Sequence, residues 1–305
     1  MTDLIFNIFD ETTSQKMQLD ERVMPKRIES LMDEDFVILP QYCGNAPEQH
    51  DYLVSFRMDA VETIYQMALD LRLGTPAAWS AIRLFDMFYS TTSNPNWQLH
   101  MPMVAAVCMD VAGKCISYDM NPCGNPKTVE YMYDLICNDK TVTCLEKFRQ
   151  FFAYIEGVVL NTLKFNILIP TPDEYLSECS RWYDGTNAAR GSPTRPESEL
   201  KVARMTSYII AAIMYSPDSM AFTALEIGGY ASYLATSPNR TAPQTHYVDP
   251  PHMKGLWTMV AWTRGNKLSE ILVESVENIC KKKPMTVLGM MYPDEHEQWK
   301  STCSL

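Results

Sequence analysis

Apolar side chains recur every three or four residues along most of this 305-residue chain, and no stretch alternates apolar and polar residues over a useful length. Such spacing places the apolar side chains on one face of an α-helix. In residues 145–164 the predicted buried face consists of Phe148, Phe151, Phe152, Ile155, Val159 and Leu163. The pattern therefore predicts an all-α protein whose helices bury their apolar faces against one another.

The first half of the chain contains five segments of helical length. Pro and Gly residues lie between or just inside them, as they do at natural helix ends. The predicted helices are 52–71, 75–90, 101–118, 127–136 and 145–164.

The second half repeats this organisation after a loop rich in Gly, Pro, Ser and Thr at 183–198. Its predicted helices are 199–215, 216–235, 254–265 and 267–283, and a further short helix is predicted at 20–36. The pattern indicates two successive all-helical domains of about five helices each. The predicted divisions are a flanking segment at 1–49, a first domain at 50–166, a second at 167–283 and a tail at 284–305.

Charge and cysteine usage exclude several classes of protein. The formal net charge of -11 disfavours non-specific binding to nucleic acid or anionic membranes. No stretch is apolar enough to span a bilayer, and the apolar part of the N-terminus is too short for a signal peptide. Nine cysteines without CxxC pairs then indicate reduced thiols in an intracellular protein, in the nucleus or the cytoplasm.

The sequence contains no motif that predicts catalysis. The segment VAGKCIS lacks the upstream Gly and the Ser or Thr of a phosphate-binding loop. His296 has no second His at zinc-ligand spacing, and the cysteines between 108 and 144 are irregularly spaced, as core residues are. We therefore expect no enzyme activity, no cofactor, no metal site and no small-molecule substrate.

Four charged residues fall on or beside the predicted buried faces of four helices in the first domain. They are Arg57, Asp86, Lys114 and Glu156. Burying a charge is costly unless it is paired and hydrogen-bonded, either within the chain or across an interface. Two interpretations are open: two internal salt bridges that fix the packing of the helices, or at least one pair at a protein interface. Lys114 could also extend its ammonium group to solvent.

Three of these helices carry longer motifs. They are RLGTPAAWSAIRLFDMFYS, VAAVCMDVAGKC and YIEGVVLNTLKFNILIPTPDEYL. They resemble the second, third and fifth helices of the first cyclin box, including its Pro-Thr-Pro exit. The resemblance covers residues 50–180 well and residues 180–283 only as a helix pattern. It implies an all-α fold of two tandem five-helix cyclin-box domains. The stretch LPQYCGNAP before the first box, together with the divergent second box, resembles members of the cyclin J subgroup. A meiotic cyclin is the alternative subtype.

The resemblance implies a role for each of the four charges. Arg57 and Asp86 match the positions of a buried structural ion pair in cyclins. Lys114 and Glu156 match positions that bind backbone carbonyls beside the regulatory helix of the kinase. On this interpretation Lys114 lies on an apolar face because a partner kinase supplies its acceptors.

The substrate-docking patch of cyclins is degenerate in this sequence. The residues that match it are Phe56, Asp59, Ala60 and Thr63. Asp59 places a carboxylate where an aliphatic side chain is usual, and Thr63 replaces a Trp. We therefore expect substrate docking at this patch to be absent or altered.

The resemblance implies a non-catalytic regulatory subunit that binds and activates a cyclin-dependent kinase as a heterodimer, in cell-cycle or meiotic control. The alternative is a cyclin-fold scaffold that binds partners without activating a kinase. A two-box transcription factor that binds DNA is disfavoured by the acidic composition. We expect no direct nucleic-acid or membrane partner.

Overall fold

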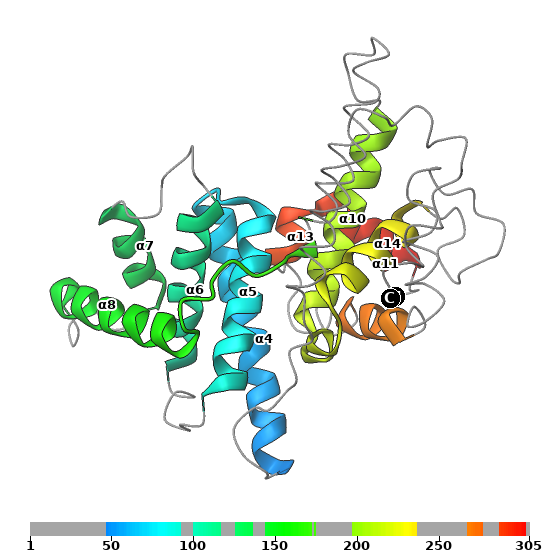
Figure 1. The fold of residues 1–305 in the computed structure, drawn as a ribbon. Helices are drawn as coiled ribbons and strands as arrows, with labels where there is room; N and C mark the ends of the chain where they lie inside the picture. Colours follow the sequence, from blue (N-terminus) through cyan, green and yellow to red (C-terminus); the bar gives the residue numbers. More distant parts are fainter. Residues whose placement is uncertain are drawn as a thin grey trace, which may run out of the picture. The chain divides into compact units, whose positions relative to one another are not determined.

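The computed structural model describes residues 47–92, 100–116, 126–136, 144–172, 174, 197–236, 267–276 and 287–302. Within these residues the regular secondary structure is helical and no strand occurs, as Figure 1 shows. The all-α prediction is confirmed for the described part of the chain. The helices predicted at 20–36 and 254–265 lie outside the described residues.

The described chain divides into two compact units. Of the described residues, those from Pro47 to Ile169, together with Met214–Ala221, form the first, which we call the N-terminal unit. Pro170–Ile213 and the residues from Phe222 onward form the second, the C-terminal unit.

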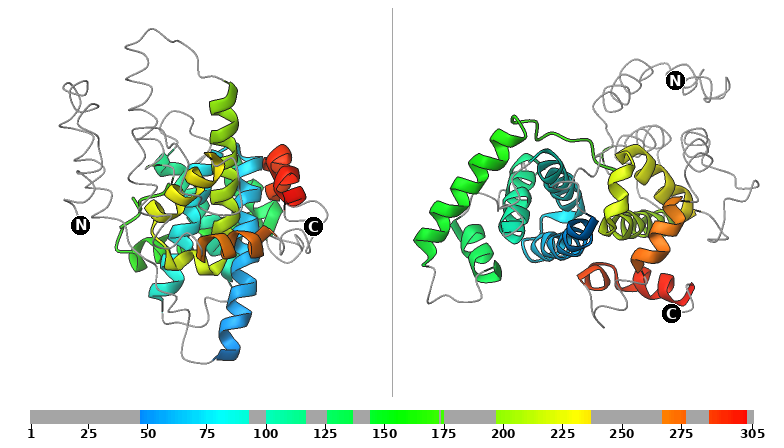
Figure 2. Two further views of the ribbon diagram at one scale, coloured as in Figure 1. Left: turned by 90° about the vertical axis from the view of Figure 1, so that its right-hand side faces the viewer. Right: turned by 90° about the horizontal axis from the view of Figure 1, so that it is seen from below.

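The N-terminal unit is built around one central helix. Its five long helices are α4 (Pro47–Asp70), α5 (Gly74–Thr91), α6 (Met101–Ile116), α7 (Pro126–Ile136) and α8 (Leu145–Thr162). Helix α6 packs against the other four, and its residues from Met103 to Gly113 are all buried. Figure 2 shows α4 and α5 on one side of α6, with α7 and α8 on the other. A helix enclosed in this way must be apolar on almost every face, which explains the run of Val, Ala and Met in its sequence.

Helix α8 ends in a strained turn. Lys164 and Phe165 adopt positive φ angles of 52° and 58°, a conformation that costs a non-glycine residue about 1–2 kcal/mol. The backbone N–H of Phe165 donates to the carbonyl oxygen of Leu160 at 2.8 Å, which closes the helix end. The turn leaves the Phe165 side chain 64% exposed.

The C-terminal unit contains described helices of the predicted second domain and two helices that follow it. They are α10 (Glu197–Tyr215, whose last two residues belong to the N-terminal unit), α11 (Ala224–Thr236), a helix over 267–276, α13 (Val287–Met291) and α14 (Pro293–Thr302). The residues predicted to be a tail at 284–305 thus contain two helices.

Helix α14 packs against α10 through polar contacts. Arg204 Nε lies 3.0 Å from Glu295 Oε1, and the Tyr208 hydroxyl lies 3.1 Å from His296 Nδ1. Sequence analysis missed this packing because α14 is mostly polar, so it has no clear apolar face.

The helix predicted at 216–235 is divided in two. A 3₁₀ helix, η2 (Pro217–Ala221), belongs to the N-terminal unit, and α11 begins only at Ala224. A capping box starts α11: Thr223 Oγ1 accepts a hydrogen bond from the Glu226 N–H at 3.1 Å, and Glu226 Oε2 accepts one from the Thr223 N–H at 2.8 Å. The prediction of one continuous helix was wrong because this Thr-x-x-Glu capping box starts a new helix at Ala224.

Candidate functional site

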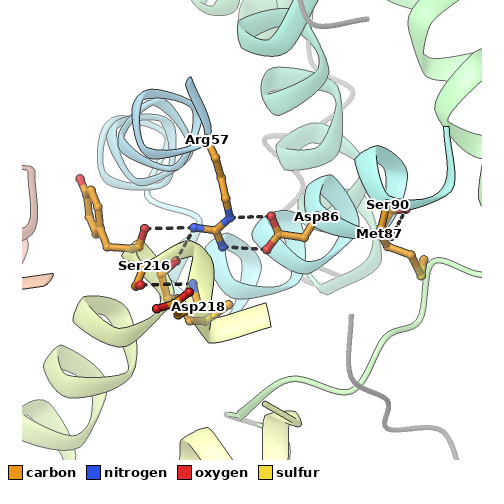
Figure 3. Close-up of polar contacts among 8 residues, drawn as sticks. Arg57, Asp86, Met87, Ser90, Ser216 and Asp218 are labelled. Carbon is orange, nitrogen blue, oxygen red and sulfur yellow. Dashed lines mark hydrogen bonds and ion pairs between the residues drawn. The ribbon is translucent and has the colours of Figure 1, made fainter. Parts of the chain in front are cut away.

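Arg57 and Asp86 join α4 to α5 inside the N-terminal unit. Arg57 Nε donates to Asp86 Oδ1 and Nη2 donates to Oδ2, each at 2.7 Å, as Figure 3 shows. The two side chains are only 1% and 3% exposed. Arg57 Nη1 also donates to the carbonyl oxygens of Met214 and Tyr215, at 3.2 and 3.0 Å. A bidentate pair with these further acceptors meets the requirement for a buried charge, so this pair holds the helices together.

The second pair of charges lies at the surface. Lys114 Nζ, near the end of α6, lies 2.8 Å from Glu156 Oε1 on α8. The Lys114 and Glu156 side chains are 38% and 27% exposed. Lys114 Nζ also lies 2.6 Å from Oδ2 of Asp110, one turn earlier on α6. We call these three residues the Asp110–Lys114–Glu156 cluster.

Asp110 is the buried member of this cluster. Its side chain is 3% exposed, and among the described residues its Oδ1 has no hydrogen-bond partner. Burial raises the pKa of Asp110, although the hydrogen bond and charge of Lys114 act in the opposite direction. Burial by itself would lower the pKa of Lys114, but hydrogen bonds to Asp110 and Glu156 and their charges outweigh it and raise that pKa. The Lys114 ammonium therefore remains charged at neutral pH.

The cluster changes the interpretation of Lys114. We expected a partner to supply its acceptors, but the chain itself supplies two. Sequence analysis did not identify Asp110, although its position four residues before Lys114 on α6 is the spacing of a helical ion pair. Lys114 is also not buried, because its long side chain reaches the surface between α6 and α8.

The residues that match the docking patch lie on α4 and offer little apolar surface. Phe56 is half-buried, Asp59 is exposed and Ala60 is buried. The Thr63 hydroxyl donates to the backbone carbonyl of Asp59 at 2.8 Å. Absent or altered substrate docking at this patch stays a prediction.

Large apolar side chains are exposed on and just after α8. On the helix, Phe151 is 37% exposed and Tyr154 is 61% exposed; beyond it, Phe165 and Leu168 are 64% and 74% exposed. The assignment of Phe151 to the buried face of α8 was wrong. The Phe151 ring instead lies at the edge of that face, with its centroid 5.4 Å from that of the His100 ring. Exposed aromatic side chains of this size are enriched at protein interfaces.

The described residues contain no group of three or more His, Cys, Asp or Glu side chains positioned to hold a metal ion. In the same part of the chain, no helix combines the length and the apolar character needed to cross a membrane.

Comparison with known protein families finds no family model that matches this chain, and comparison with curated proteins finds no matching relative.

Proposed function

We propose that this chain is a non-catalytic regulatory subunit that binds and activates a cyclin-dependent kinase. The observation that supports the proposal most directly is the half-exposed Lys114–Glu156 pair, which joins α6 to α8 at the surface of a five-helix unit. These are the two positions that the cyclin resemblance assigns to the kinase interface. The buried Arg57–Asp86 pair adds support because it joins the two helices at which the resemblance expects it.

The proposed mechanism is positional. The surface formed by α6, α8 and the residues after α8 would dock on the regulatory helix of the kinase. Lys114 has three N–H donors and uses two of them within the chain, so one remains for a partner carbonyl. Exposed Phe165 and Leu168 would supply apolar contact area. Docking would move the Lys–Glu ion pair of the kinase toward its active arrangement.

The proposal includes two tandem cyclin boxes, the second beginning near the Pro-Thr-Pro exit, and a role in cell-cycle or meiotic control in the nucleus or the cytoplasm. The N-terminal unit is its better-supported part because α4–α8 make up the five helices that a cyclin box requires.

One observation favours a second candidate, a scaffold that binds a partner without activating a kinase. Asp110 competes for the Lys114 ammonium, which in cyclins contacts the kinase. If that competition weakens the interface, the chain could retain binding and lose activation.

The test is to express the tagged chain in a eukaryotic lysate beside Lys114→Glu and the control Lys267→Glu. Lys267 is exposed on the helix over 267–276, so the control makes the same change of charge outside the proposed docking surface. We expect wild type and Lys267→Glu to recover an active cyclin-dependent kinase and Lys114→Glu to recover none. Recovery of an inactive kinase would favour the scaffold. Recovery of no kinase by wild type would refute the first proposal, and recovery of other partners unaffected by Lys114→Glu would favour the scaffold.

A further inference from the structure

The Asp110–Lys114–Glu156 cluster has an excess of negative charge. It holds two carboxylates and one ammonium, which leaves one net negative charge when all three are ionised. Its buried member, Asp110, has one oxygen without a hydrogen-bond partner among the described residues. A buried acceptor that lacks a donor costs free energy, and the cost is larger when the acceptor is charged. The cluster therefore has too few donors for its acceptors.

Glu156 is the acid that a partner can reach. Its side chain is 27% exposed, whereas that of Asp110 is 3% exposed. Within the described residues the Glu156 carboxylate accepts a hydrogen bond from Lys114 Nζ at Oε1, over 2.8 Å. A donor from outside the chain can therefore approach the Glu156 carboxylate without disturbing the core.

The charge of the incoming group decides what happens to Asp110. An acceptor, such as a carbonyl oxygen, can take the third N–H of Lys114, but it supplies no donor to the buried Asp110 carboxylate. A cation that binds Glu156 instead allows Lys114 to shift toward Asp110 and serve both of its oxygens. The cluster therefore favours a cationic group over an additional acceptor.

We infer that the cluster is a receptor for a cationic side chain, Arg or Lys, of the partner protein, with Glu156 as its contact and Asp110 as the residue that sets the preference for positive charge. This inference deepens the proposed function, on which it rests for the identity of the partner. It assigns to Asp110 a positioning role that acts through Lys114.

A probe of simple chemistry tests the inference without any kinase. The full chain, labelled with ¹³C at the lysine ε-carbons, is titrated with an acetylated and amidated tetra-arginine peptide. The Lys114 signal is assigned by its loss in Lys114→Arg, and it reports events at the cluster only. We expect saturable shifts in wild type, and dissociation constants about two- to fivefold higher in Asp110→Asn and Glu156→Gln. Glu274→Gln removes an exposed carboxylate elsewhere and should leave the dissociation constant unchanged.

The inference is overturned if tetra-arginine leaves the Lys114 signal in place, or if it moves that signal with equal affinity in Asp110→Asn and Glu156→Gln. Glu156→Gln keeps the test valid if Asp110→Asn perturbs the fold, because Glu156 is half-exposed. If the lysate experiment captures a kinase, the amount captured by Asp110→Asn gives a second test. Weaker capture by Asp110→Asn supports a cationic contact, and equal or tighter capture opposes it. If no kinase is captured, the proposed function fails and the peptide titration still decides this inference.

Discussion

Arg57 on α4 holds Asp86 on α5 by two parallel hydrogen bonds of 2.7 Å, and both residues are buried. Two long helices of the N-terminal unit are thus joined by a charged pair within an apolar core. Such a pair contributes little net stability compared with apolar residues of the same size, but breaking it leaves one buried charge without its partner.

Substitution of Asp86 by Asn should therefore be strongly destabilising. The change preserves the shape of the side chain and removes its charge, and we expect the free energy of unfolding to fall by about 3–5 kcal/mol. Urea denaturation followed by circular dichroism measures this change. Asp59→Asn on the exposed face of α4 serves as control and should alter stability by less than about 0.5 kcal/mol. An Asp86→Lys variant that melts at the wild-type temperature would show that the pair is not structural.

Two glycines inside helices should respond in opposite ways to substitution by Ala. A Cβ atom on Gly228 of α11 would lie 3.0 Å from the backbone oxygen of Pro172, whereas a Cβ on Gly157 of α8 would meet nothing within 4 Å. We expect Gly228→Ala to cost about 1–3 kcal/mol through overpacking, and Gly157→Ala to stabilise α8 by about 0.5–1 kcal/mol. Thermal melts of the two variants side by side check the prediction. Equal effects would mean that the contact with Pro172 is relaxed in solution.

The cysteines should differ widely in reactivity. Cys108 is fully buried in α6, and burial together with the charge of Asp86 raises the pKa of its thiol. Cys144, which precedes α8, is exposed. Because the thiolate is the reactive form, iodoacetamide should modify Cys144 in the folded protein and leave Cys108 unmodified until the chain unfolds. Peptide mass spectrometry over time measures both rates, and early modification of Cys108 would contradict the packing of α6.

Asp110 should make stability depend on pH. Its pKa is raised in the folded chain, so folding favours the protonated form, and the ionised form opposes folding. Stability contributed by proton uptake is then lost as pH rises from the unfolded-state pKa through the folded-state pKa. Asp110→Asn cannot ionise, so we expect its free energy of unfolding, relative to that of wild type, to be higher at pH 7 than at pH 4. Urea denaturation at both pH values measures the difference, and a gain that is larger at pH 4 would reverse the sign and refute the assignment.

Much of the N-terminal unit was predictable from the spacing of apolar residues. The helices predicted at 75–90 and 127–136 correspond to α5 (Gly74–Thr91) and α7 (Pro126–Ile136). The spacing of apolar residues locates helix interiors better than helix ends. The first helix was predicted to begin at residue 52, whereas α4 begins at Pro47. The spacing of apolar residues did not predict α14, because polar contacts to α10 take the place of an apolar face.

The sequence by itself determined that the described chain is helical, where most helix interiors lie, and that Arg57, Asp86, Lys114 and Glu156 are charges with unusual positions. These features depend on neighbours three or four residues apart, which a single sequence displays. Only the tertiary structure decided which charges meet, that Asp110 shares Lys114 with Glu156, and that Phe151 lies at the edge of the buried face. Pairing and burial depend on how helices distant in sequence pack against one another, and local spacing does not encode that arrangement.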